Sequence, residues 1–171
     1  MRLFTLPLVV ALLLGASAPV GATVPKAAVF DFELVDTSLE GATNGPRADE
    51  QARLLRVGDQ LRQRLTQSGR FAVVDTAPVA AEAHGSNLQA CGGCDVDFAR
   101  KLGADLAITG TVQKVSNLIL NMNITVRDAI TGKPVAAMSA DMRGNTDESW
   151  TRALDYLVRN RLLAPNYGAP Q

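Results

Sequence analysis

The stretch from Gly103 to Trp150 constrains the fold most, because apolar and polar residues alternate over three successive segments. Between positions 118 and 126 every even residue is apolar, whereas most odd residues are polar. An alternation of period two is typical of a strand with one side-chain face in a core and the other face outside it. The stretch therefore predicts a three-stranded antiparallel meander that leads into a capped helix.

The two hairpin loops of this meander determine which residues face each other across the strands. A loop over residues 115–117 pairs Val112 with Leu120 and keeps the apolar residues of both strands on one face. A loop over residues 130–132 is the three-residue type, with Gly132 in the left-handed conformation. The second loop pairs Val126 with Ala136 and Ile124 with Met138.

Polar side chains then form rows on the opposite face of the meander. This face has two interpretations: it is a surface that is simply open to water, or it is a binding surface for a polar ligand or an extended peptide. The candidate binding residues are Thr109, Asn123 and Ser139 in one row, Thr111, Asn121 and Asp141 in the next, and Arg143 at the rim.

Ahead of the meander, the chain predicts a strand, a helix and a second strand. The first strand covers Lys26–Leu34, and apolar residues at helical spacing between Leu54 and Leu65 indicate a helix that ends at Gly69. Phe71–Asp75 is the second strand. A strand–helix–strand unit of this length favours parallel pairing of its strands. Residues 36–47, rich in glycine and asparagine, are expected to be a loop.

Two further helices complete the predicted order β-α-β-α-β-β-β-α. One covers Val96–Leu102, and the other follows the meander, where Asn145 and Glu148 have capping-box spacing. This order predicts a single α/β domain with a mixed sheet of about five strands and helices mainly on one face.

The N-terminus has the pattern of a secretory signal peptide. Arg2 precedes the apolar run Leu3–Leu14, which is too short to span a bilayer comfortably, and small residues follow it. We therefore expect a signal peptide over residues 1–22, a mature domain over residues 23–164 and a flexible tail over residues 165–171. The mature protein should be periplasmic or secreted, without a transmembrane segment.

The charge of the chain gives no reason to expect a nucleic-acid partner. The sequence has 17 Lys and Arg residues and 17 Asp and Glu residues, so its formal net charge is 0. Removal of the signal peptide with Arg2 leaves a charge of about −1, and neither value favours binding to an acidic polymer.

The only two cysteines, Cys91 and Cys94, lie in a Cys-Gly-Gly-Cys segment and have three interpretations. In an oxidising compartment they are expected to form a disulfide that clips the loop before the Val96 helix. They could instead be a redox-active pair, since Cys94 lies near a helix start. A metal site would need His84, the only histidine, as a third ligand, and a structural zinc site requires four.

No catalytic constellation is present in the sequence. There is no nucleophile elbow, and the Gly-rich pattern of a dinucleotide site is absent, so no cofactor is expected.

Several stretches carry a resemblance to a known family: AAVFDFELVDTSLEG, SGRFAVVD, CGGCDVDFARKLGAD, VSNLILNMNITVRDAITG and RGNTDESW. Together they resemble a family of small secreted bacterial proteins catalogued as a domain of unknown function, which implies no catalytic residues. In pattern, the chain is also similar to the N-terminal α/β domain of TolB and to the curli-secretion protein CsgG. Those two proteins are cell-envelope components whose shared α/β domain mediates protein contacts. This chain lacks the propeller of the first and the lipidated cysteine of the second, so neither role carries over.

The sequence thus leads to two functional hypotheses. The first is a non-enzymatic accessory protein of the envelope that binds a protein partner or a polar ligand through its sheet. The second is a thiol–disulfide or metal-handling protein centred on Cys91 and Cys94.

Overall fold

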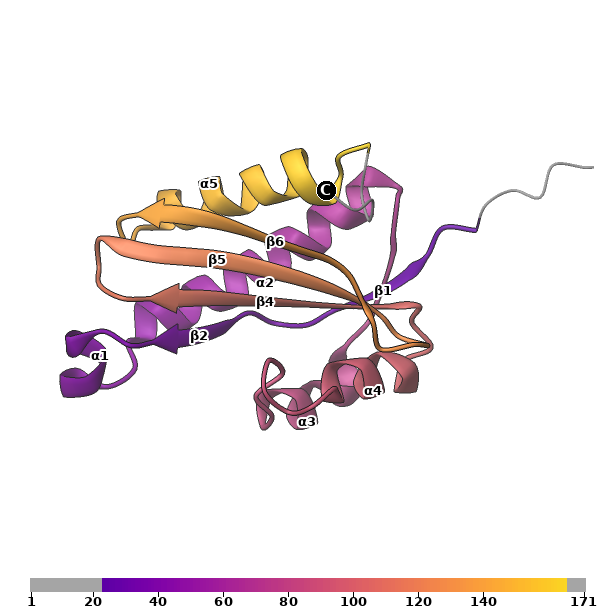
Figure 1. Cartoon of the computed structure of the whole chain (residues 1–171), viewed down its shortest axis with the longest axis horizontal. Coiled ribbons are helices and arrows are strands. Elements are labelled where there is room, and N and C mark those ends of the chain that lie inside the picture. Colours follow the sequence, from indigo (N-terminus) through magenta and orange to yellow (C-terminus); the bar gives the residue numbers. More distant parts are fainter. Residues whose placement is uncertain (1–22, 166–171) are drawn as a thin grey trace, which may run out of the picture.

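The three strands of the meander are the longest in the protein and form one half of a mixed sheet (Figure 1). They are β4 (Leu106–Lys114), β5 (Ile119–Asp128) and β6 (Pro134–Arg143). The structure is a computed structural model that describes residues 23–165, so the predicted signal peptide and most of the predicted tail lie outside the described residues. The sheet has the strand order β3-β1-β4-β5-β6, and β2 pairs with β4 beyond the end of β1.

The predicted first strand is in fact two short strands, β1 (Lys26–Val29) and β2 (Glu33–Asp36). Both pair in parallel with β4, but different backbone groups make the contact. Just after β1, the N–H of Phe30 donates to the carbonyl of Ile108, and just after β2, the N–H of Thr37 donates to the carbonyl of Lys114. Even residues therefore face β4 before the break and odd residues after it, so the chain slips by one residue between the two strands.

This slip reverses which face of the sheet the side chains occupy. Phe30 packs in a small core under the short helices, whereas Phe32 packs in the main core on the other face. A single strand over residues 26–34 would place Phe30 and Phe32 on the same face, so the predicted first strand is wrong in this respect. Gly110 on β4 makes room for the change, because a Cβ atom there would lie 2.4 Å from the Phe32 ring.

The connection from β1 to β3 (Ala72–Val74) runs through α2 (Ala48–Ser68), and β1 and β3 are parallel, as predicted. Gly69, with φ of 64°, ends α2 as predicted. The segment before α2 was expected to be a loop but contains the short helix α1 (Leu39–Asn44). The hydroxyl of Ser38 accepts a hydrogen bond from the N–H of Gly41 and so caps this helix.

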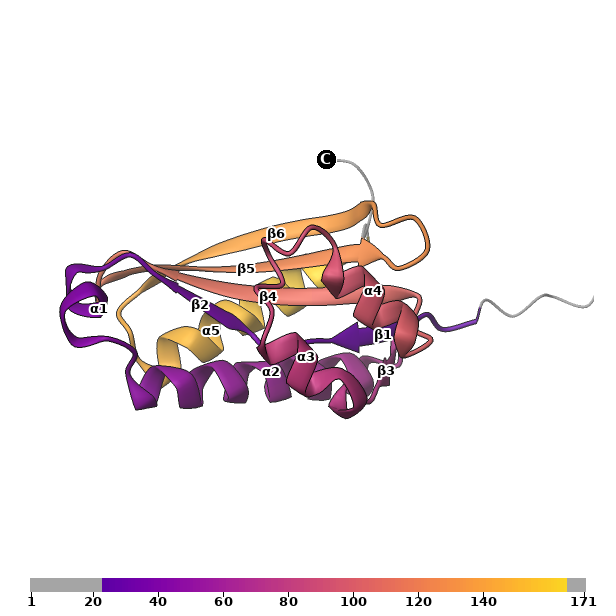
Figure 2. The ribbon, with the colours of Figure 1, turned by 90° about the horizontal axis from the view of Figure 1, so that it is seen from below.

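The two long helices, α2 and α5 (Asp147–Leu157), lie on one face of the sheet (Figures 1 and 2). The shorter α3 (Ala80–His84), which follows the 3₁₀ turn Ala77–Val79, and α4 (Cys94–Lys101) cover one end of the other face. The helical turn Val158–Leu162 continues α5. The predicted α/β fold is therefore confirmed. No helix among residues 23–165 is long and apolar enough to cross a membrane.

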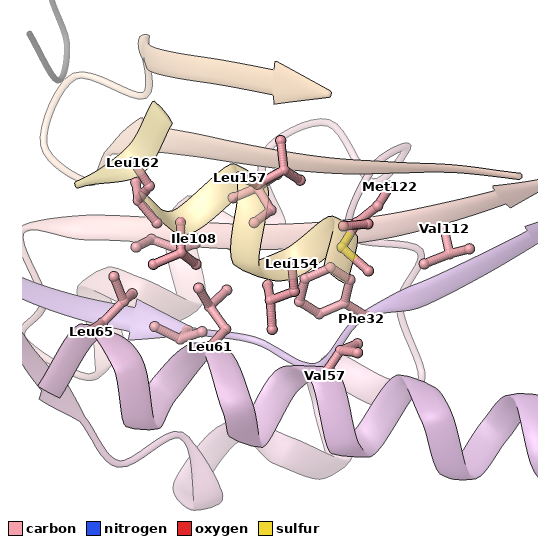
Figure 3. Packing of buried hydrophobic residues seen from close by; sticks show 14 of the residues in the cluster. Phe32, Val57, Leu61, Leu65, Ile108, Val112, Met122, Leu154, Leu157 and Leu162 are labelled. Atoms are coloured by element: carbon pink, nitrogen blue, oxygen red, sulfur yellow. The ribbon is translucent and has the colours of Figure 1, made fainter. Parts of the chain in front are cut away.

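Apolar residues of α2, α5 and the sheet form the main core, shown in Figure 3. Every second residue of β5 from Leu120 to Val126 is buried in it, which is the face that the period-two pattern predicts. The side chains that fill the centre of this core are Leu61, Leu65, Ile108, Met122, Leu154 and Leu157.

The predicted register is correct for the β5–β6 hairpin and differs from the structure for the β4–β5 hairpin. Val126 pairs with Ala136 and Gly132 has φ of 71°, as predicted. Between β4 and β5, however, Val112 faces Met122 rather than Leu120. The loop is longer than predicted because Ser116 holds an extra turn, and a shift of two residues leaves each side chain on its predicted face.

The start of α5 also differs from the prediction. Thr146, not Asn145, is the N-cap, and its hydroxyl accepts a hydrogen bond from the N–H of Ser149. Asn145 instead faces the interior beside the β4–β5 hairpin.

The side chain of Lys114 lies inside the molecule at the end of β4. It is fully buried, and its Nζ is 2.7 Å from Glu50, 3.1 Å from Glu40 and 3.2 Å from Asp36. Burial alone would lower the pKa of this ammonium, but the hydrogen bonds that it donates to the three carboxylates outweigh burial and raise the pKa. The charged ammonium thereby joins β2, α1 and α2 to the sheet.

Two asparagines extend this ionic cluster to the hairpin and to α5. Asn117 Nδ2 donates to Glu40 Oε2 at 2.8 Å, and Asn145 Nδ2 donates to Glu50 Oε1 at 2.6 Å. Asn145 Oδ1 in turn accepts a hydrogen bond from Nε1 of Trp150 at 3.0 Å. The elements at this end of the molecule are thus held by one network of charged and amide groups.

Replacement of Lys114 by methionine should destabilise the protein strongly, because it leaves the fully buried Glu50 carboxylate without its cation. We expect Lys114→Met to lower the free energy of unfolding in urea by about 3–5 kcal/mol. The matched control is Arg152→Met, since Arg152 forms an exposed ion pair with Glu148 and should contribute about 0–1 kcal/mol. Equal losses in the two variants would contradict the structural role of the buried charge.

Candidate functional site

The structure divides the predicted polar face into a covered part and an exposed part. Thr109 and Thr111 are buried, at 4% and 6% exposed, so these two residues do not form part of an accessible surface. The predicted rows are also shifted, because the register between β4 and β5 differs by two residues. The observed rows across β4, β5 and β6 are Thr111, Asn123 and Ser139 in one, and Gln113, Asn121 and Asp141 in the next.

The exposed part is a surface at the end of the sheet that carries α1 and the β4–β5 hairpin. We call it the open face. It consists of Val35 from β2, Gln113 from β4, Ile119, Asn121 and Asn123 from β5, and Ser139, Asp141 and Arg143 from β6.

Hydrogen bonds between side chains organise the centre of the open face. Asn121 Nδ2 donates to Asp141 Oδ1 at 2.8 Å, and Ser139 Oγ donates to Asn121 Oδ1 at 3.0 Å. Arg143 pairs with Ile119 across the strands at the rim. Five of the seven residues predicted for this surface therefore lie on the open face, namely Asn121, Asn123, Ser139, Asp141 and Arg143.

Exposed aliphatic side chains flank these polar groups, which the sequence did not indicate. Ile119 and Val35 belong to the open face and are 54% and 41% exposed. At the adjoining end of the molecule, Leu118 is 72% exposed and Leu39 is 84% exposed. Exposed aliphatic residues that gather in one place are typical of a contact surface, whereas isolated ones are common on any protein.

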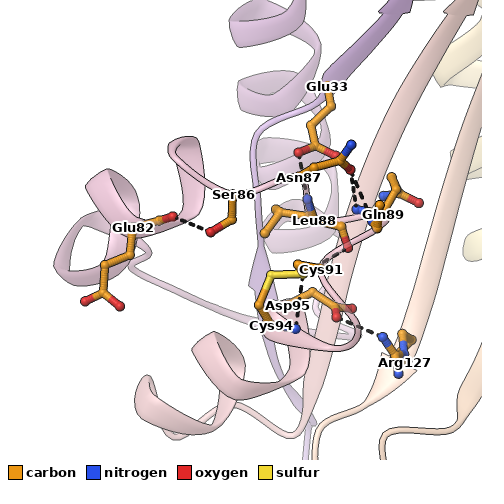
Figure 4. Close-up of a disulfide and its surroundings, with 11 residues drawn as sticks. Glu33, Glu82, Ser86, Asn87, Leu88, Gln89, Cys91, Cys94, Asp95 and Arg127 are labelled. Carbon is orange, nitrogen blue, oxygen red and sulfur yellow. Dashed lines mark hydrogen bonds and ion pairs between the residues drawn. A yellow bond between two sulfur atoms is a disulfide. The ribbon is translucent and has the colours of Figure 1, made fainter.

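The disulfide loop explains why Thr109 and Thr111 are buried. Its N-terminal part is fixed to β2, where Glu33 accepts a hydrogen bond from the N–H of Leu88 at 2.8 Å. After the loop, Asp95 on α4 forms an ion pair of 2.8 Å with Arg127 on β5 (Figure 4). The loop between these contacts crosses the face of β4.

Cys91 and Cys94 are bonded to each other in this loop, with Cα atoms 5.7 Å apart. Cys94 is the first residue of α4, and its N–H donates to the sulfur of Cys91 at 3.2 Å. Cys91 is exposed and Cys94 is half-buried. A structural clip and a redox-active pair are both compatible with this geometry.

The His84 side chain does not form a common site with the two cysteines. Its Nε2 lies 2.7 Å from Oδ2 of Asp31, at the break between β1 and β2. The other oxygen of Asp31 accepts a hydrogen bond from Arg62 at 2.7 Å. Asp95, the carboxylate next to Cys94 in the sequence, pairs with Arg127. Within residues 23–165, no group of three His, Cys, Asp or Glu side chains is placed to hold a metal ion.

The Asp31 carboxylate has two side-chain partners, the guanidinium of Arg62 from α2 and the imidazole of His84 from α3. Burial alone would raise its pKa, but the hydrogen bonds and charges of Arg62 and His84 outweigh burial and lower the pKa. The sequence gave no indication that Asp31 and His84 form a pair, because the two residues lie 53 positions apart.

The lowered pKa of Asp31 predicts an acid-dependent contribution to stability. The contribution is present above the pKa of the unfolded carboxyl, about 4, and is lost as the pH falls through the lower pKa of the folded state. Asp31→Asn should therefore lower the free energy of unfolding by about 1–3 kcal/mol at a pH of about 5.5 and by much less near pH 2.5. Urea unfolding at both pH values measures this difference.

The control for this experiment is Asp97→Asn, since Asp97 is 67% exposed and contacts only Arg100 on its own helix. Its effect should be small at both pH values. A loss in Asp31→Asn that is the same at both pH values would show that the charge of Asp31 does not stabilise the fold.

Several solved structures are similar to this chain at low sequence identity. Hypothetical protein CT253 from Chlamydia trachomatis is 13% identical, with a TM-score of 0.50, 86% of this chain covered and 99% of that chain. Lipoprotein GNA1162 from Neisseria meningitidis is 17% identical, with a TM-score of 0.47, 80% of this chain covered and 94% of that chain. TolB from Acinetobacter baumannii is 13% identical, with a TM-score of 0.40, 81% of this chain covered and 29% of that chain.

The likeness to CT253 extends to the fold alone, and no curated protein sequence matches the chain. A family profile described as "Protein of unknown function (DUF2380)" matches residues 25–162, which is most of the chain. The predicted membership of a family of unknown function is thus confirmed. This protein belongs to the DUF3280 family.

Proposed function

We propose that this protein is a non-enzymatic accessory protein of the cell envelope that binds a protein partner through its open face. The observation that carries the proposal is the hydrogen-bonded group of Asn121, Ser139 and Asp141, in which Ser139 and Asp141 are exposed. The exposed Ile119 and Val35 flank this group. A surface that offers amide, hydroxyl and carboxylate groups beside aliphatic side chains suits a protein partner better than a small polar ligand.

The rigidity of the open face supports a binding role. Its strands end at the hairpin that Asn117 and the Lys114 cluster hold in place. A surface that is already ordered in the free protein loses little conformational entropy when a partner binds. The expected signal peptide over residues 1–22 supports a location in the periplasm or outside the cell.

Site-specific photo-crosslinking tests this proposal. A benzoylphenylalanine residue placed at the exposed Ser139 should crosslink to a discrete protein of the native envelope fraction. The same residue at the exposed Gln63, on the far side of α2, is the control and should give no such product. Asp141→Lys should abolish the Ser139 crosslink because it reverses the charge at the centre of the open face. Crosslinks of equal yield from both positions, or none from Ser139, would contradict the proposal.

Thiol–disulfide exchange at Cys91 and Cys94 is the second candidate function, and the observation that favours it is the exposure of Cys91 together with the position of Cys94 at the start of α4. We expect the pair to be structural. The double variant Cys91→Ser/Cys94→Ser should lose about 2 kcal/mol of unfolding free energy or less, because the bond closes a very short loop. The wild-type protein treated with a reductant should lose the same amount, which provides the control. Reduction of insulin by the wild-type protein, with a reduction potential above about −230 mV, would establish the redox role instead.

A further inference from the structure

Strand β2 has one edge that is not paired with another strand. It pairs with β4 on one side only, and β3, which pairs with β1 on the other side, ends before it reaches β2. Figure 1 shows β2 at the lower edge of the sheet, and Figure 2 shows it uncovered between α1 and α3. Because Thr37 donates to β4, odd residues of β2 face β4 and even residues face outward. The backbone N–H and C=O of Leu34 thus point away from the sheet, and within residues 23–165 they have no hydrogen-bond partner.

A groove of about 480 Å³ runs along this edge. It continues the path of β3 and is bounded on one side by α2 and on the other by α3 and the start of the disulfide loop. Residues from the break and β2 form its floor, and Leu55, which is 53% exposed, lies on its α2 wall. An added strand in this groove would therefore contact protein on both of its faces.

We propose that the free edge of β2 binds an extended segment of a protein partner, which adds a strand to the sheet. Only a polypeptide backbone presents donors and acceptors that alternate at the spacing of Leu34 and Asp36. The slip between β1 and β2 exposes this edge, and β3 shows that a parallel path beside β1 already accommodates a strand. The site lies beside the open face, with which β2 shares Val35, and it does not depend on the function proposed for that surface.

The walls of the groove specify the side chains of this segment. The α2 wall presents Leu54 and Leu55, with the polar Gln51 one turn before them, and the Leu34 side chain packs against the main core on that side. On the opposite wall, the charge of Asp31 is balanced by Arg62 and His84, whereas Glu33 forms no ion pair among the described residues. Because successive side chains of a strand alternate between faces, the fitting segment alternates aliphatic residues with lysine or arginine.

Another edge of the sheet, along β6, does not offer the same enclosure. The depression there is lined only by β6 and the region of α5, so an added strand would be covered on one face. The observations therefore favour β2 as the position of the added strand.

A synthetic peptide tests the proposal directly. The probe is acetyl-Thr-Val-Lys-Leu-Lys-Val-Thr-amide, titrated into the ¹⁵N-labelled mature protein to about 1 mM while amide shifts are followed by NMR. We expect saturable shifts at Leu34, Leu55 and Ala83, which line the groove. The control peptide has the same side chains with N-methyl groups on alternate residues, so that it cannot donate along its edge, and it should not bind.

Variants locate the peptide and separate this proposal from the one for the open face. Leu55→Lys changes an exposed wall residue and should raise the dissociation constant at least about tenfold. Leu34→Pro removes the outward N–H without removing a bond to β4 and should do the same. Asp141→Lys on the open face should leave the constant within about twofold. Absence of saturable binding, equal binding of the methylated peptide, or weakening by Asp141→Lys instead of Leu55→Lys would overturn the proposal.

Discussion

The buried ammonium of Lys114 is the interaction on which one end of this protein depends. Three carboxylates from β2, α1 and α2 lie within 3.2 Å of it, and only β2 is also joined to the end of β4 by strand pairing. The Asn117 amide carries the network into the β4–β5 hairpin, whose residues border the open face. The surface that we propose for partner binding is therefore fixed by a charge cluster beneath it rather than by apolar packing alone.

The one-residue slip between β1 and β2 is the second constraint, and it has two consequences. It sends Phe30 and Phe32 to opposite faces, so that a main core forms under α2 and α5 and a smaller one under α3 and α4. It also moves β2 out of the path that β3 follows, which leaves a free edge beside a groove. Edge strands are usually protected by charges or short length, and β2 is short, with Glu33 and Asp36 at its ends.

The sequence predicted the parts of this fold that local patterns control. The alternation in the meander placed the core face of β5 correctly, and Gly132 marked the turn of the second hairpin. It could not predict the burial of Thr109 and Thr111, because the loop that covers them is held by contacts of Glu33 and Arg127 with residues far along the chain. Lys114 occupies a core-face position of β4, which was a usable signal, but a lysine at a strand end is normally exposed.

Amide hydrogen exchange along β2 tests the central claim most directly, namely that this short strand is paired on one side and open on the other. In the free protein, the amide of Thr37, which donates to Lys114 at 2.9 Å, should exchange slowly, as should the amides in the centre of β5. The amide of Leu34 should exchange orders of magnitude faster, although its side chain packs against the core. Equal, strong protection of Leu34 and Thr37 would mean that the edge is already occupied and would contradict this account.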